Sequence, residues 1–247
     1  MNEPNSVARQ IYPLIRRRLF PLWLASAWPY ALEAGCMISI AIAIHWTGPM
    51  GSPADRWHSM SGLIKTGIIL AFVAGIFLPL DLGAAGVAMI VKSDRQGEGL
   101  DLNSFVSRLA SIVWLAVPLS ISIGAASIFM TGLFLVPWSS FVMPALATAQ
   151  ANPRTAVRRS LGFSLRRFAP LLGLALATGV AQSSAFLAFF VCRMAAGDGE
   201  WRVGIIVGWS LFAAMMSIVA MTRSVTLALL YLDAVRSEEV LRAPQLI

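Results

Sequence analysis

The sequence has few charged residues and few cysteines for its length. Charged residues make up 13% of the 247 positions, whereas hydrophobic residues make up 57%. A soluble globular domain carries about 25% charged residues, so we expect an integral membrane protein instead. The two cysteines, Cys36 and Cys192, both lie in apolar segments. This placement argues against a disulfide or metal framework and predicts that both are small core residues.

The sequence also lacks the motifs of common catalytic and nucleotide-binding sites. It contains no HExxH, GxSxG or Walker pattern, and no GxGxxG between a strand and a helix. No predicted membrane span holds a histidine near its middle. We therefore expect no enzymatic activity, no cofactor and no metal site.

Acidic residues are outnumbered by lysine and arginine, 12 to 19, which gives a net charge of +7. The basic residues lie at the ends of apolar segments and form no separate hydrophilic module. Membrane orientation and anionic lipid head groups explain them better than nucleic acid does. The densest stretch, 152–172, has five arginines within fourteen positions before it turns apolar. Its apolar spacing predicts an amphipathic helix on the membrane surface that leads into a span.

Six apolar segments are long enough to cross a membrane, for which about 20 residues suffice. The fourth segment contains Pro137 and Pro144 and is expected to be irregular. The predicted spans are 20–46, 62–91, 105–130, 131–150, 169–194 and 203–232. The sequence thus predicts an all-α integral membrane protein with one helical domain over 1–247.

The segments that open the first, third and fifth spans are similar to one another. Residues 17–25, 108–119 and 166–175 each follow an amphipathic stretch and each begin a helix directed outward. We interpret them as three copies of one unit, made of a cytoplasmic amphipathic surface helix, an outward span and a return span. Shared membrane constraints without a true repeat are the alternative. Small residues at Gly124, Ser127, Gly173 and Ala177 are predicted to form close helix contacts.

The side of this scheme that carries both termini holds fourteen of the 19 lysines and arginines. The positive-inside rule therefore places both termini in the cytoplasm. The same residues are candidates for binding the anionic lipids of the cytoplasmic leaflet or an acidic partner. The candidates are Arg158, Arg159, Arg166 and Arg167 in the basic stretch, and Arg16, Arg17 and Arg18 before the first span.

Three charged residues fall inside predicted spans: Glu33, Asp81 and Arg223. At about 1.5 Å per residue, they lie roughly 14–20 Å from the cytoplasmic helix ends, near one level. A single charge at that depth is costly, so we expect them to face the interior and to pair, Arg223 with Asp81 first, while Glu33 either joins them or is neutral. Such a cluster can serve as a proton or ion relay or as a head-group site. It can also be a structural ion pair that fixes helix register.

Two stretches carry a resemblance to a known family. The first holds Val136-Pro137, Pro144 and the run AVRRSLGFSLRRFAPLLGL, with Arg159-Ser160 inside it; the second is LLYLDAVRSEE, with Tyr231, Asp233 and Arg236. They resemble the six-span bacterial inner-membrane proteins of the YciC type. They are also similar to the membrane domain attached to some glycerophosphodiester phosphodiesterases. The resemblance implies a helical domain in the bacterial inner membrane and no established chemistry, because the phosphodiesterase activity belongs to a separate soluble domain.

The leading functional hypothesis is a non-enzymatic accessory or scaffolding component of the inner membrane. It would bind anionic lipids or a larger membrane protein complex through its basic helices. A second hypothesis is a small-molecule or lipid transporter that uses the charged level within the membrane. A third, a membrane-embedded lipid-modifying enzyme, has the least support, because only Glu33 and Asp81 could supply converging carboxylates.

Overall fold

The computed structural model describes residues 4–47, 61–97, 102–128, 132–148, 153–196 and 201–242, and these ranges are helical apart from short turns. The all-α prediction is confirmed for this part of the chain. The ends of two predicted spans, at 129–131 and 149–150, lie outside the described residues. The helices are α1 (Pro4–Thr47), α3 (Gly62–Gln96), α4 (Leu102–Ile128), α5 (Gly132–Ser139), α6 (Val142–Thr148), α7 (Pro153–Arg166), α8 (Phe168–Ala195) and α9 (Trp201–Arg242).

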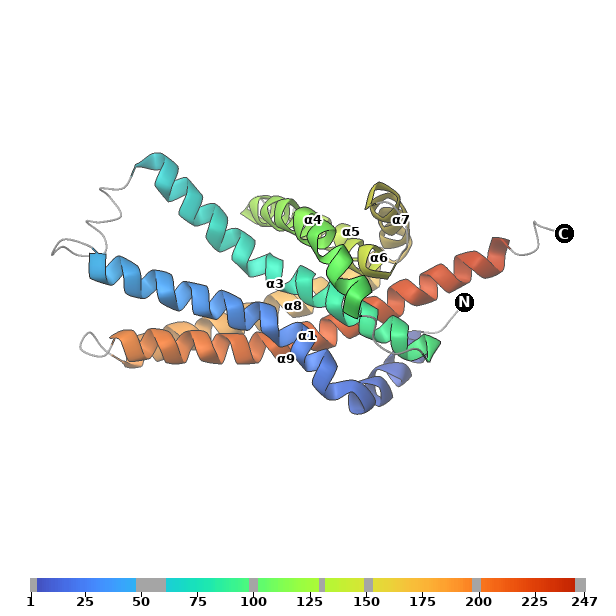
Figure 1. Cartoon of the computed structure of the whole chain (residues 1–247), viewed down its shortest axis with the longest axis horizontal. Coiled ribbons are helices and arrows are strands. Elements are labelled where there is room, and N and C mark those ends of the chain that lie inside the picture. The colour runs from blue at the N-terminus through green and yellow to red at the C-terminus, as the bar shows by residue number, and fades with distance from the viewer. Residues whose placement is uncertain are drawn as a thin grey trace.

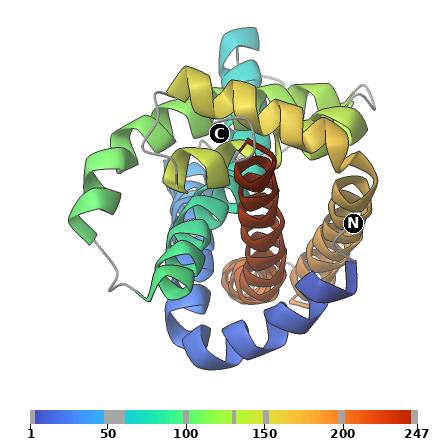
Figure 2. The ribbon, with the colours of Figure 1, turned by 90° about the vertical axis from the view of Figure 1, so that its right-hand side faces the viewer.

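The helices form an elongated bundle with α9 at its centre. Helices α1, α3, α8 and α9 run along the long axis, whereas α4 to α7 cover only one half of it (Figure 1). The first half of α1, the last turns of α3 and α9, and α7 all lie at the end where both chain termini are found. We call this the basic end, because it carries Arg16, Arg17, Arg18, Lys92, Arg95, Arg159, Arg166, Arg167 and Arg236. Figure 2 looks at this end, with α1 and α7 on opposite sides of α9.

Two surface helices are separated from the following helix by the same backbone break. Arg18 inside α1 has φ −122° and ψ 27°, and Arg167 between α7 and α8 has φ −118° and ψ 30°. Pro21 and Pro170 each stand three residues later. Proline has no N–H and its ring clashes with the carbonyl four residues earlier, which favours a break at that point. Proline alone does not force the break, because Pro29 of α1 and Pro118 of α4 lie within helix that continues. The first and third of the three predicted units thus share a proline three residues after the break and the same backbone conformation at the break.

The middle unit differs from the other two. Helix α4 runs without interruption from Leu102 to Ile128, so no separate surface helix precedes it. The return segment is irregular, as the prolines predict: α5 and α6 are short helices joined by Ser140 and Phe141. Ser140 Oγ donates to the carbonyl oxygen of Val136 at 2.6 Å, which satisfies one acceptor at the break.

Small residues let α1 approach α3 closely. A Cβ atom on Gly83 would lie 3.5 Å from the Cα atom of Ser26, and one on Gly86 would lie 3.3 Å from the Cβ atom of Ala25. This contact joins two buried apolar clusters. One surrounds Tyr231 near the basic end, and the other surrounds Tyr30 and Phe212 further along the bundle.

Two helices among the described residues are long and apolar enough to cross a membrane: 168–195, with 28 residues, and 202–238, with 37. At about 1.5 Å per residue, the shorter one spans about 42 Å, against about 30 Å for the hydrocarbon core. Only 17% of an 18-residue apolar stretch of α8 is buried inside the protein. A core helix of a soluble protein would be mostly covered. The outward side chains of α8 are Leu176, Val180, Leu187, Phe190, Val191 and Met194.

The cysteines do not occupy the predicted core positions. Both are free thiols, with Cys36 exposed on α1 and Cys192 half-buried on α8. The apolar segments that contain these cysteines include outward-facing positions as well as buried ones. Hydropathy alone therefore predicted the burial of both cysteines wrongly.

Candidate functional site

A polar cluster lies inside the bundle around Tyr30 of α1. The charges of Glu33, Asp81 and Arg223 all act on the hydroxyl of Tyr30. Arg223 and Tyr30 are buried, at 6% and 1% exposure. The structure therefore brings the three predicted residues to one region, around a tyrosine that the sequence analysis missed because its ring suits an apolar core.

The expected direct ion pair between Arg223 and Asp81 is not formed. Ser120 Oγ donates to Asp81 Oδ2 at 3.0 Å, whereas no hydrogen bond or ion pair joins Asp81 to Arg223 in this described part of the bundle. Arg223 Nη1, Tyr30 Oη and Glu33 Oε2 are buried and have no hydrogen-bond partner. Buried polar groups are rarely left unsatisfied, so this cluster is suited to hold water, an ion or a polar ligand.

The arginines of α7 divide into two sets. Arg158 and Arg166 are exposed. Arg159 instead donates from Nε and Nη2 to Glu238 Oε2 of α9, at 3.1 and 2.9 Å, and its guanidinium lies 5.5 Å from the centre of the Phe163 ring. Helix α7 is therefore attached to α9 by Arg159, while Arg158 and Arg166 remain exposed.

The first half of α1 is attached to the basic end in a similar way. Arg18 Nε donates to Asp94 Oδ1 of α3 at 2.8 Å, while Arg16 and Arg17 are exposed. Arg95 of α3 donates to Gln10 Oε1 of α1 at 2.6 Å and to Asp233 Oδ1 of α9 at 3.0 Å. The ends of three helices are thus joined by charged side chains.

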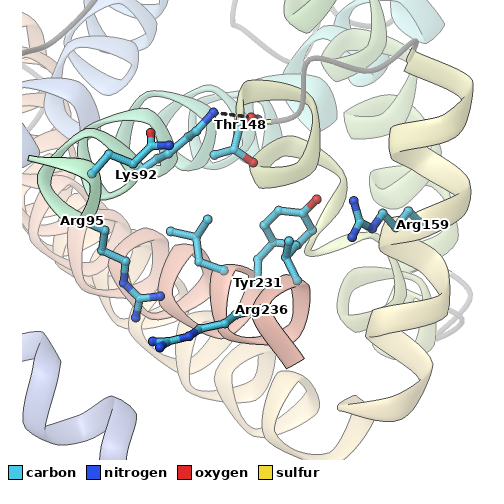
Figure 3. A pocket seen from close by; sticks show the side chains of 9 residues that line it. Lys92, Arg95, Thr148, Arg159, Tyr231 and Arg236 are labelled. Atoms are coloured by element: carbon cyan, nitrogen blue, oxygen red, sulfur yellow. Dashed lines mark hydrogen bonds between the residues drawn. The ribbon is translucent and has the colours of Figure 1, made fainter. Parts of the chain in front are cut away.

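A cavity of about 500 Å³ opens between α3, α6, α7 and α9 at the basic end (Figure 3). Figure 3 shows Arg159 on the opposite side from Lys92 and Arg95, with Tyr231 between them. Four of the nine lining residues are cations, and none is acidic. The lining comprises Lys92, Arg95, Gln96, Thr148, Arg159, Tyr231, Leu232, Val235 and Arg236.

Aromatic packing fixes the inner wall of this cavity. The ring of Tyr231 lies with its centre 5.8 Å from that of Phe141 and 6.0 Å from that of Phe163. Its hydroxyl interacts with the side chain of Thr148. Because Phe141 stands at the break between α5 and α6, the irregular return segment positions one wall of the cavity.

Sequence reasoning missed the cavity because its residues are far apart in the chain. From the sequence, Lys92 and Arg95 were used only to assign the orientation of the predicted spans. Their spacing of three residues nevertheless places them on one helix face. Arg159, Tyr231 and Arg236 lie in the two stretches that carry the family resemblance. The structure brings these stretches together at the cavity.

The described residues include no group of three or more histidine, cysteine, aspartate or glutamate side chains placed to hold a metal ion. No protein family, curated protein or solved structure matches this chain.

Proposed function

We propose that this chain is a non-enzymatic protein of the bacterial inner membrane that binds anionic lipids at its basic end. It crosses the bilayer six times and keeps both termini in the cytoplasm. The three outward and return pairs are α1 with α3, α4 with the α5 and α6 segment, and α8 with α9. Its role is that of an accessory or scaffolding component, which holds lipid or a partner complex against its cytoplasmic surface.

The observation that carries this proposal is the junction between α7 and α8. Exposed Arg158 and Arg166 stand on α7, directly before a helix whose outward face is apolar. Head groups favour the arginines and hydrocarbon favours the apolar face, so the junction fits the boundary between the two. The break at Arg18 in α1 repeats the arrangement, and α1 lies on the other side of α9 from α7 (Figure 2).

Lipid selectivity in mixed micelles tests the proposal. The purified full chain is given phosphatidylglycerol and phosphatidylcholine at equal concentration, and bound lipid is counted by native mass spectrometry. We expect phosphatidylglycerol to be preferred. Replacing Arg158, Arg166 and Arg167 with glutamine should weaken its binding at least about tenfold, because each cation near the surface contributes about 1 kcal/mol.

A matched control removes one cation at the opposite end of the bundle, by Arg202→Gln in the first turn of α9. This change should leave the selectivity intact. Equal binding of the two lipids by the unaltered chain would contradict the proposed function.

The buried polar cluster favours transport as a second candidate function. Its unpartnered Arg223 and Tyr30 atoms would be satisfied by water or by a polar substrate within the bundle. The test places a single cysteine at position 30 in a chain whose Cys36 and Cys192 are replaced by alanine. A membrane-impermeant thiol reagent should label it if the cluster opens to water. Complete protection from both sides of the membrane would exclude alternating access at this level.

A further inference from the structure

We propose that the cavity at the basic end is a binding site for a phosphate monoester group. The ligand class follows from the cations that line the cavity, chiefly Lys92, Arg95, Arg159 and Arg236. The inference rests on the proposed function for its membrane setting. The proposed function requires only that the basic end attracts anionic lipids in general. The inference adds one defined site and one defined ligand chemistry.

The charge of the cavity matches a dianion. Arg95 pairs with Asp233, and Arg159 pairs with Glu238. Lys92 bonds to a main-chain carbonyl, which carries no charge, and no ion pair is found for Arg236 among the residues described around it. Four positive charges therefore face two carboxylates, and two positive charges remain.

A phosphate monoester carries close to two negative charges at neutral pH, because its second pKa is about 6. A phosphodiester head group carries one. The cavity should therefore distinguish the two esters by charge as well as by the number of oxygen atoms that accept hydrogen bonds.

The geometry also suits a phosphate. The cations come from three helices, α3, α7 and α9, and line one cavity. Arg159 faces Lys92 and Arg95 across Tyr231 (Figure 3). The guanidinium of Arg236 can present paired donors that match phosphate oxygens. Arg95 and Arg159 contribute chiefly charge, because they already donate to Asp233, Gln10 and Glu238. The volume of about 500 Å³ lies within the range of ligand pockets, about 300–1,000 Å³. The carboxylate partners hold Arg95 and Arg159 in place before any ligand arrives, which reduces the entropy lost on binding.

The alternative is that these cations serve only to join helix ends. Arg95 and Arg159 do join them, and Lys92 caps a helix. No such link of Arg236 is found among the described side chains; it is exposed on the last turns of α9 and lines the cavity. It is therefore the residue that separates the two explanations, and its replacement is the least disruptive to the fold.

The experiment compares phosphatidic acid, a monoester, with phosphatidylglycerol, a diester, in mixed micelles of the full chain. Bound lipid is counted by native mass spectrometry, and inorganic phosphate is added as a soluble competitor. We expect the monoester to bind about tenfold more tightly, since a hydrogen bond to a charged group contributes about that much. Arg236→Gln should abolish this preference and Arg236→Lys should retain part of it. Arg166→Gln, which removes an equal charge outside the cavity, should weaken both lipids equally.

Each outcome has a defined meaning. If inorganic phosphate competes, the site accepts soluble phosphate compounds as well as lipids. If it does not compete, the site is specific for a lipid head group. Both results support a phosphate-binding site in the cavity. If the chain shows no preference for anionic lipids but binds inorganic phosphate saturably, and Arg236→Gln abolishes this, the proposed function fails and the phosphate site stands. A monoester preference that is absent, or that survives Arg236→Gln in a folded protein, overturns the inference.

Discussion

Lys92 Nζ donates a hydrogen bond of 2.8 Å to the main-chain carbonyl oxygen of Thr148. Arg108 Nη1 donates to the preceding carbonyl, that of Ala147, at 3.1 Å. These are the last carbonyls of α6, which have no partner within the helix. Cations from α3 and α4 therefore satisfy the end of a seven-residue helix and complement its dipole.

Replacing Lys92 with methionine should destabilise the protein by about 1–3 kcal/mol, because the buried end of α6 loses a charged donor. Thermal unfolding in detergent, followed by circular dichroism, measures the change. Arg158→Gln is the control, since that side chain is exposed on α7, and it should shift stability by less than about 0.5 kcal/mol. Equal melting of the two variants would show that the Lys92 cap contributes nothing.

The pair formed by Arg159 and Glu238 should attach α7 to α9 without adding much global stability. Both side chains are partly exposed, so a double-mutant cycle with Arg159→Gln and Glu238→Gln should give a coupling of about 0.2–1 kcal/mol. Amide hydrogen exchange should speed up within α7 in each single variant and not in α8. Unchanged exchange in α7 would mean that its apolar face alone holds it.

The hydroxyl of Tyr30 should contribute nothing to stability. It is buried and has no hydrogen-bond partner, so Tyr30→Phe removes an unsatisfied group and should leave the unfolding temperature unchanged or raise it. A lowered unfolding temperature would show that the hydroxyl has a partner, such as bound water. If Tyr30→Phe is stable but abolishes transport in reconstituted vesicles, the second candidate function gains direct support.

Asp81 and Arg223 should behave as a coupled pair although they make no direct contact. The charge of Asp81 acts on Arg223 inside the bundle, so Asp81→Leu leaves a buried cation without compensation. We expect each single leucine variant to be destabilised by about 3–5 kcal/mol and the double variant to recover most of that loss. Unfolding in detergent measures all three. Additive losses would show that the two charges are independent.

Much of the fold could be predicted because its causes are local. The breaks at Arg18 and Arg167 are favoured by prolines three residues later, and the irregular return segment follows from Pro137 and Pro144. The cavity could not be predicted, because α3, α7 and α9 meet there from distant parts of the chain. The hydrogen bond from Ser120 to Asp81 could not be predicted either, because hydropathy does not tell which face of α4 meets α3. Asp81 and Arg223 interact through their charges, but no direct ion pair joins them among the described residues.

The small residues show the same limit. Gly124 is buried, as predicted, but Gly173 and Ala177 are exposed on α8. Their spacing indicated a face suited to close packing, yet spacing does not tell which face of a helix meets a neighbour. The closest approach is made instead by Gly204 and Gly208 of α9, which pack on the last turns of α8 and on Phe189.

Two glycine substitutions in neighbouring helices should therefore have opposite effects. A Cβ atom on Gly204 would lie 2.7 Å from the Cβ atom of Ala196 and 3.3 Å from backbone atoms of α8, so Gly204→Ala forces the helices apart. We expect it to cost about 1–3 kcal/mol. A Cβ atom on Gly179 would meet nothing within 4 Å, so Gly179→Ala should gain up to about 1 kcal/mol from helix propensity. Thermal unfolding in the same detergent compares the two, and equal stability of the variants would mean that α8 and α9 are not packed this closely.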